Sequence, residues 1–333
     1  MPKHTIVYRL SVHVGFACVF FLGTTGPAAY AAPRSSASVY FIGHSLIDSP
    51  LPELIHRLAT AAGKNHRYSY QLIIGAPIVW NWEHAGEGKI SNAKTELARP
   101  GYYDALVVTE ALPILEHLTW SDPIGNSLKF YDLARNANPH IVFYLYETWH
   151  EAPNSETADH YIRTIQTERA YWERILHGIN RARPSGQRAY MIPAGQAFER
   201  LIREISAGNL HDARRNTRST YYGLDSRLDY LGDYTEPNRV HLNTLGAYFV
   251  ALVHFATIYR QSPVGLPTLM NFNGGIEGVP ASVDPALATK LQQIAWDAVR
   301  AYPLSGVTDS GSPTPPQPEP QRQPRRLRQP QER

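Results

Sequence analysis

Cysteine is almost missing from this sequence. The single one, Cys18, stands near the N-terminus, in a segment that we expect to be removed from the mature protein. Without a second cysteine the chain cannot form an intramolecular disulfide. Its stability must therefore come from a packed core, and 333 residues are enough for one large domain or two small ones.

An excess of either charge is lacking as well. The chain has 32 Lys and Arg against 29 Asp and Glu, a formal net charge of +3, and several of the positive residues stand at the C-terminal end. Hydrophobic residues make up 43% and charged residues 18%, which is ordinary for a soluble globular protein. The part that folds is near neutral, so no nucleic-acid partner is indicated.

A hydrophobic run long enough to span a membrane is also lacking. The apolar stretch at residues 10–23 is short for a bilayer span and contains His13. A basic start precedes it and a small-x-small ending follows, which is typical of a secretory signal peptide. We therefore expect residues 1–32 to be removed near Ala31 or Ala32, leaving a periplasmic or secreted protein without stable membrane insertion.

The C-terminal tail has few large apolar residues. Residues 306–333 are rich in Pro, Gln, Ser and Arg, a composition that cannot bury enough surface to fold, and we expect disorder. The alternative is a basic tether that contacts an anionic polymer weakly. Residues 33–305 remain as the folded domain, in which residues 209–238 lack clear periodicity and are expected to form a loop or a cap over the site.

Short apolar runs alternate with helical patterns through this domain. Runs of strand composition occur at residues 38–43, 68–74, 104–109, 140–146 and 188–193. Helical patterns occur at residues 51–58, 127–136, 158–182, 196–207 and 245–260. The alternation predicts a three-layer α/β/α sandwich with a central parallel sheet of about five strands.

A serine follows the first of these strands directly, in Gly43-His44-Ser45-Leu46. Ligands of such sheets bind beyond the carboxyl ends of the strands. A serine on a strand-to-helix turn presents its hydroxyl there, beside helix N-terminal amides that can hold an oxyanion. The alternative role for Ser45 is a helix N-cap.

A histidine precedes the last apolar helix, in Asn238-Arg239-Val240-His241-Leu242-Asn243. It stands in a loop, and a neutral imidazole near a serine can take the hydroxyl proton during attack on a carbonyl. Taken alone, a histidine at this position is more often a helix cap or a surface residue.

Together these residues resemble the SGNH/GDSL hydrolase family. Gly-His-Ser-Leu follows the first strand, Gly75 follows the second, and Val-His-Leu-Asn precedes the final helix, in the order of that family. The similarity spans roughly residues 39–266. It implies a flavodoxin-like fold and ester hydrolysis through an acyl-serine intermediate, with no cofactor. By this match Ser45 is the nucleophile, His241 is the base, and the amides of Ser45 and Gly75 line the oxyanion hole.

One departure from the family concerns the oxyanion hole. The family has an asparagine just after the third strand, where this chain has Thr109-Glu110. The hydroxyl of Thr109, or the side chain of Asn81 on the loop after Gly75, is the expected substitute. A carboxylate would repel an oxyanion, so we expect Glu110 to point elsewhere or to be protonated.

A second departure concerns the acid that supports the histidine. The family has an aspartate three residues before it, where this chain has Asn238. An asparagine can orient an imidazole but cannot stabilise imidazolium as an anion does. Asp233, Glu236 or a backbone carbonyl are the candidate substitutes, and a Ser–His dyad is the alternative.

Polar and aromatic residues stand at several strand ends, and the sequence around Glu110 and Glu147 resembles a bacterial branch of the same superfamily. We expect substrate contacts from His44, Trp80, Trp82, Glu110, Glu147, Trp149 and His150. The two tryptophans on the loop after Gly75 suit stacking on sugar faces, or packing of that loop. A metal site at Glu110, Glu147 and His150 has no firm ligand motif, so hydrogen-bonding roles are favoured and no metal is expected.

These features predict an exported serine esterase that hydrolyses O-acyl esters, chiefly acetyl esters, of a carbohydrate or cell-wall polymer. Its expected partner is an acylated small molecule or glycan. One alternative is an O-acyltransferase of the same fold, which passes the acyl group to a glycan hydroxyl. The other is a glycan-binding module without catalysis, which the two departures from the family favour.

Overall fold

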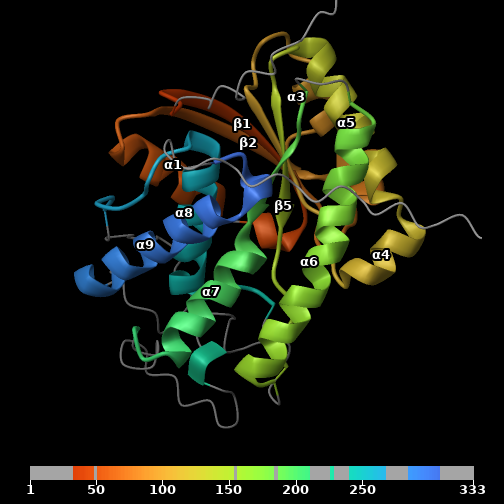
Figure 1. The fold of residues 1–333 in the computed structure, drawn as a ribbon. Helices are drawn as coiled ribbons and strands as arrows, with labels where there is room; N and C mark the ends of the chain where they lie inside the picture. The colour runs from red at the N-terminus through yellow and green to blue at the C-terminus, as the bar shows by residue number, and fades with distance from the viewer. Residues whose placement is uncertain are drawn as a thin grey trace, which may run out of the picture. The chain divides into compact units, whose positions relative to one another are not determined.

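The structure is a computed structural model. It describes residues 33–48, 51–153, 156–183, 187–210, 226–228, 240–267 and 284–307 (Figure 1). All of these belong to one compact unit, Ala32–Arg333. The expected signal peptide, most of the expected cap and the tail from residue 308 lie outside the described residues. Within the described part, no helix combines the length and apolar character that a membrane crossing requires.

Strand β1 (Ser36–Gly43) lies at the centre of the sheet. Every residue of it except Ser36 is buried. Both neighbours, β2 (Asn65–Leu72) and β4 (Ala105–Val108), run parallel to it. A strand that is paired on both edges and covered on both faces needs a continuous apolar run, which the sequence Val-Tyr-Phe-Ile supplies.

The sheet has six strands in the order β3-β2-β1-β4-β5-β6. β5 (Val142–Glu147) and β6 (Tyr190–Pro193) continue the parallel sheet beyond β4. The sixth strand, β3 (Lys89–Ile90), pairs antiparallel with β2. The predicted α/β/α sandwich and its parallel strands are confirmed, and β3 was missed because two residues are too few to show periodicity.

Helices cover both faces of the sheet, as Figure 1 shows. They are α1 (Leu51–Ala61), α2 (Ile78–Glu83), α3 (Ala93–Leu97), α4 (Ile114–Trp120), α5 (Pro123–Ala137), α6 (Ala158–Arg181), α7 (Ala194–Ser206), α8 (Thr244–Tyr259) and α9 (Pro285–Ala301). Because side chains alternate along a strand, β1 serves two cores. Val39 and Phe41 pack with α1, α7, α8 and α9, whereas Tyr40 and Ile42 pack with α3, α5 and the second half of α6.

Four of these helices were not predicted from the sequence. α2, α3 and α4 have five to seven residues each, too few to establish a helical period. α9 is longer, and its start signal was present: Asp284 accepts hydrogen bonds from the amides of Ala286 and Leu287, and Pro285 occupies the first turn.

The order of strands fixes where a ligand site is expected. From β1 the chain proceeds to β2 on one side and later to β4 on the other, so the connections diverge at the carboxyl end of β1. Such a switch point leaves a crevice between the diverging loops. Ser45 stands at this point, in η1 (Ser45–Ile47), a 3-10 helix of one turn that follows β1.

Replacing Ile42 tests the core between β1 and α5. Its side chain is fully buried, so Ile42→Ala is expected to lower the free energy of unfolding by about 2–5 kcal/mol. The matched control is Ile74→Ala, because Ile74 is 60% exposed and its loss should cost less than about 0.5 kcal/mol. Urea unfolding measures both, and equal losses would contradict this packing.

Candidate active site

The chain turns sharply between β1 and Ser45. A Cβ on Gly43 would lie 2.5 Å from the Cγ2 atom of Thr109, so the close approach of β4 requires glycine there. His44 is the N-cap of the following turn, and its Nδ1 accepts a hydrogen bond from the amide of Leu46 at 3.4 Å. The turn therefore places Ser45 at the end of the central strand, where it is half-buried.

His241 lies directly against this serine. Its Nε2 is 2.7 Å from Ser45 Oγ, although the two residues are 196 positions apart in sequence. When Nε2 is unprotonated it accepts the hydroxyl hydrogen of Ser45, which is the geometry that general-base activation of a serine requires. The two residues that were predicted as nucleophile and base are thus in hydrogen-bond contact.

Two contacts fix the loop that carries His241. The indole Nε1 of Trp149 donates a hydrogen bond to the carbonyl of Val240 at 2.7 Å. On the other side, Asn243 caps α8 by accepting from the amide of Gly246 at 2.9 Å. His241 is therefore held from the end of β5 and from the start of α8. The candidate acids Asn238, Asp233 and Glu236 lie outside the described residues.

The amides of Ser45 and Gly75 are suited to bind an oxyanion. Gly75 adopts a positive φ of 67°, which glycine adopts readily, in a loop that is tied to β1 because Ile73 donates to the carbonyl of Gly43 at 3.1 Å. Among the described residues, neither the amide of Ser45 nor that of Gly75 has a hydrogen-bond acceptor. One unpaired N–H at the serine itself and a second on a loop tied to the end of the same strand are donors of the kind that stabilise a tetrahedral oxyanion.

The other two candidate oxyanion donors are occupied elsewhere, which corrects the prediction. The hydroxyl of Thr109 is buried and donates to the carbonyl of Tyr146 at 2.9 Å, so it joins β4 to β5. The side-chain amide of Asn81 is also buried. It donates to the carbonyls of Gly43, Ala76 and Pro77 at 3.2–3.3 Å and therefore holds the Gly75 loop against the end of β1.

Gln71 completes this support and was missed from the sequence. It is buried within β2, its Nε2 donates to the carbonyl and to the Oδ1 of Asn81, and its Oε1 accepts from the amide of Ala93. The available signal was the position of Gln71 between Tyr70 and the apolar run Leu72-Ile73-Ile74, since a buried polar group needs partners.

Glu110 does not contact substrate space, which corrects a second prediction. Its buried carboxylate accepts hydrogen bonds from the amides of Ile78 and Ala111 and from the hydroxyl of Ser121. The carboxylate is therefore directed away from the oxyanion site, as expected. It attaches the start of α2 and the end of α4 to β4. Burial raises the pKa of Glu110 to about 7.

His44 is likewise a structural residue and not a substrate contact. Its Nε2 donates to the carbonyl of Glu110 at 3.0 Å, while Nδ1 accepts from Leu46. Burial lowers the pKa of His44 to about 4, so the ring is neutral and keeps this tautomer. The ring joins the turn at Ser45 to the end of β4.

The end of β5 carries three of the predicted contact residues. Glu147 is buried and accepts from Gln196 Nε2 at 2.8 Å, which attaches the start of α7 to β5. Trp149 is buried and holds Val240, so neither residue is placed to touch a substrate. His150 is half-buried, and its Nδ1 donates to Glu168 at 3.0 Å, a hydrogen bond that raises the pKa of His150.

The two tryptophans of α2 differ in their surroundings. Trp80 is 45% exposed and stacks on His84 with ring centroids 3.7 Å apart. Trp82 packs edge-on against Phe130 of α5, which is the packing alternative considered for it. Of these two tryptophans, Trp80 is the one that offers an exposed aromatic surface, five residues after Gly75 in sequence.

A metal site does not form from the acidic and histidine residues at the strand ends. Glu110 and Glu147 each have their own hydrogen-bond donors, and His150 is paired with Glu168. In the part of the chain that the structure describes, no group of three His, Cys, Asp or Glu side chains is arranged to hold a metal ion.

No protein-family model and no curated protein matches this sequence. Solved structures are similar in fold. A DUF4886 family protein from Bacteroides uniformis has a TM-score of 0.50 at 18% identity, over 80% of this chain and 96% of that one. A family 3 carbohydrate esterase from Clostridium thermocellum has a TM-score of 0.40 at 13% identity, over 68% of this chain and 98% of that one. A GDSL-like lipase from Bacteroides thetaiotaomicron has a TM-score of 0.33 at 12% identity, over 67% of this chain and 86% of that one. The first likeness shows a shared fold.

The burial of Glu147 predicts how stability depends on pH. Burial raises the pKa of Glu147 to about 8 from an ordinary 4.5, so the folded state favours the protonated acid. The stabilisation from this proton is complete at about pH 4 and is lost as the pH rises through about 8. The glutamine in Glu147→Gln stays neutral at every pH. As the pH rises from about 5 to about 9, the free energy of unfolding of this variant should therefore fall by a few kcal/mol less than that of the wild type. Urea unfolding across that range measures this, and parallel curves would contradict it.

Proposed function

We propose that this chain is an exported serine esterase that hydrolyses O-acyl esters. The observation that carries the proposal is the 2.7 Å contact between Ser45 Oγ and His241 Nε2 at the switch point of a parallel sheet. The order of the motifs around these residues, which resembles that of the SGNH/GDSL hydrolases, supports the same reaction.

In the proposed mechanism Ser45 Oγ attacks the ester carbonyl while His241 Nε2 takes the hydroxyl proton. The oxyanion of the tetrahedral intermediate is bound by the amides of Ser45 and Gly75. His241 then gives its proton to the departing alcohol, which leaves an acyl-serine. Water attacks this ester while His241 takes its proton, and His241 then returns that proton to Ser45 Oγ as the carboxylic acid is released.

His241 becomes positively charged in each of these steps and needs support for its Nδ1 side. Asp233, Glu236 and the side chain of Asn238 are the proposed candidates, with a Ser–His dyad as the alternative. Trp149 contributes separately, since its bond to Val240 fixes the loop and so the distance between His241 and Ser45.

The proposed substrate is an acetylated carbohydrate or cell-wall polymer. The exposed ring of Trp80 on α2 supports this, because a flat indole face suits the apolar face of a sugar. The signal-peptide pattern of residues 1–32 supports export to a compartment where such polymers occur.

Substitution of the serine and the histidine tests the reaction. The chain without residues 1–32 is expected to hydrolyse p-nitrophenyl acetate, and Ser45→Ala and His241→Ala should each lower kcat/KM more than about a thousandfold. Release of p-nitrophenol measures this, with Ile74→Ala as a surface control. Equal background rates in all variants, and no labelling of Ser45 by a phosphonate, would favour the glycan-binding module instead.

Substitution of Trp149 tests the support of the histidine loop. Trp149→Phe keeps the ring that packs on Phe198 but removes the N–H that holds Val240. We expect kcat on p-nitrophenyl acetate to fall about tenfold with KM nearly unchanged, because His241 is less well placed while the binding surface is kept. A rise in KM at constant kcat would assign Trp149 to binding.

A further inference from the structure

Helix α6 extends beyond the sheet that it covers. It has 24 residues, whereas the preceding strand β5 has six. At about 1.5 Å per helical residue and 3.3 Å per strand residue, the helix spans about 36 Å and the strand about 20 Å. Tyr161 and Ile165 pack in the core beside α8, while Trp172 and Ile175 pack in the core beside α5. The first turns of α6 therefore cross the carboxyl edge of the sheet.

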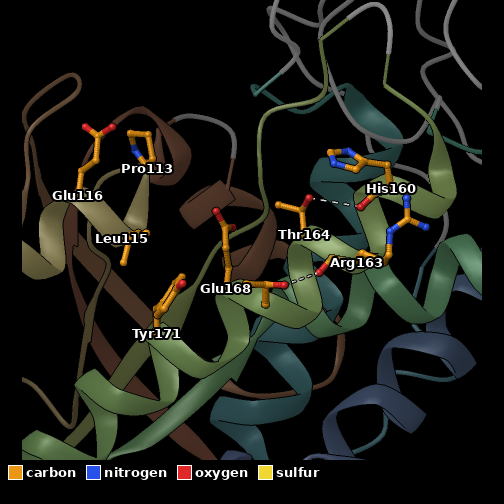
Figure 2. Close-up of a pocket in the computed structure, with 9 residues that line it drawn as sticks. Pro113, Leu115, Glu116, His160, Arg163, Thr164, Glu168 and Tyr171 are labelled. Atoms are coloured by element: carbon orange, nitrogen blue, oxygen red, sulfur yellow. Dashed lines mark hydrogen bonds between the residues drawn. The ribbon is translucent and has the colours of Figure 1, made fainter.

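A cleft of about 430 Å³ lies between these turns and the start of α4. We call it the α4–α6 cleft. Figure 2 shows Leu115 and Glu116 on the α4 side and Arg163 on the α6 side, with the Glu168 carboxylate pointing into the space between them. Its volume is within the range of roughly 300–1,000 Å³ that is common for small-molecule sites.

The end of β5 connects this cleft to the loop of His241. Glu168 lines the cleft and accepts the hydrogen bond from His150 Nδ1 at 3.0 Å. Trp149, the residue directly before His150, donates a hydrogen bond to the carbonyl of Val240, which is next to His241. Two consecutive residues thus join a wall of the cleft to the proposed general base.

The geometry of the reaction then decides which part of an ester lies on this side. β2 and β4 flank β1 on opposite sides, and β5 lies beyond β4. The oxyanion amide of Gly75 follows β2, whereas the loop of His241 is held from β5. Because His241 must protonate the departing alcohol, the alcohol part of the ester points away from Gly75 and toward the ends of β4 and β5. The α4–α6 cleft is lined by residues of the segments that follow β4 and β5.

We propose that the α4–α6 cleft binds the alcohol part of the substrate, and that this part is an uncharged, polyhydroxylated chain such as a neutral oligosaccharide. The inference rests on the proposed esterase function and specifies its substrate class.

The side chains of the cleft account for this choice. Glu116 and Glu168 accept from hydroxyl groups and repel a polyanion, and Arg163 donates to hydroxyl oxygens. Leu115 is 49% exposed and, with the ring of Tyr171, offers apolar surface to the carbon face of a sugar ring. A long acyl chain would leave these charged groups desolvated without partners.

Binding is measured first on Ser45→Ala, so that catalysis plays no part. By isothermal titration, xylohexaose, cellohexaose or chitohexaose should bind, and Leu115→Asp and Arg163→Ala introduced into that background should each weaken the best of them about tenfold. Arg174→Ala, an exposed arginine later in α6 that does not line the cleft, is the matched control and should bind as before. If none of the three neutral oligosaccharides binds, or if oligogalacturonate binds more tightly, the inference is overturned.

Turnover separates this inference from the proposed function. The ratio of kcat/KM for acetylated xylo-oligosaccharide to that for p-nitrophenyl acetate should fall about tenfold in Arg163→Ala and stay constant in Arg174→Ala. A constant ratio in both variants would place the alcohol part outside the cleft. Glycan binding by a protein that hydrolyses neither ester would instead refute the esterase and leave the cleft as a glycan site.

Discussion

The parallel pairing of β1 on both of its edges is the constraint on which the rest of the structure depends. Because β2 and β4 approach from opposite sides and run in the same direction as β1, their carboxyl ends meet at one edge. The chain must leave β1 there through a turn with no room for a Cβ at Gly43. That turn fixes Ser45 between two diverging loops, one of which carries Gly75 and the other Glu110.

Buried polar side chains hold this edge in place. Asn81 ties the Gly75 loop to β1, Glu110 ties α2 and α4 to β4, Thr109 ties β4 to β5, and Trp149 ties β5 to the loop of His241. Each forms a hydrogen bond with a backbone group at this edge, where a buried backbone group left without a partner would cost about 1–3 kcal/mol. The same residues look like catalytic or binding groups in sequence, since both roles place polar residues at strand ends.

The candidate site was therefore predictable in part. Ser45 stood out because it follows the first strand directly, and His241 because it precedes the last apolar helix, in a motif order that resembles the SGNH/GDSL hydrolases. The directions of the side chains of Thr109 and Asn81 were not predictable, because the local sequence does not decide whether such a side chain points toward the crevice or back into the protein. Glu168 had no signal at all, since a glutamate on a long polar helix is ordinary.

The sequence by itself determined the alternation of strands and helices, the parallel sheet and the edge at which the chemistry lies, because hydrophobic periodicity is a local property of the chain. Only the tertiary structure decided that Ser45 and His241 meet at 2.7 Å, that the strand-end carboxylates turn inward, and that α6 overhangs the edge to form a cleft with α4. These features depend on contacts between segments far apart in sequence. Such contacts are set by packing and hydrogen bonding, which cannot be derived from a local sequence pattern.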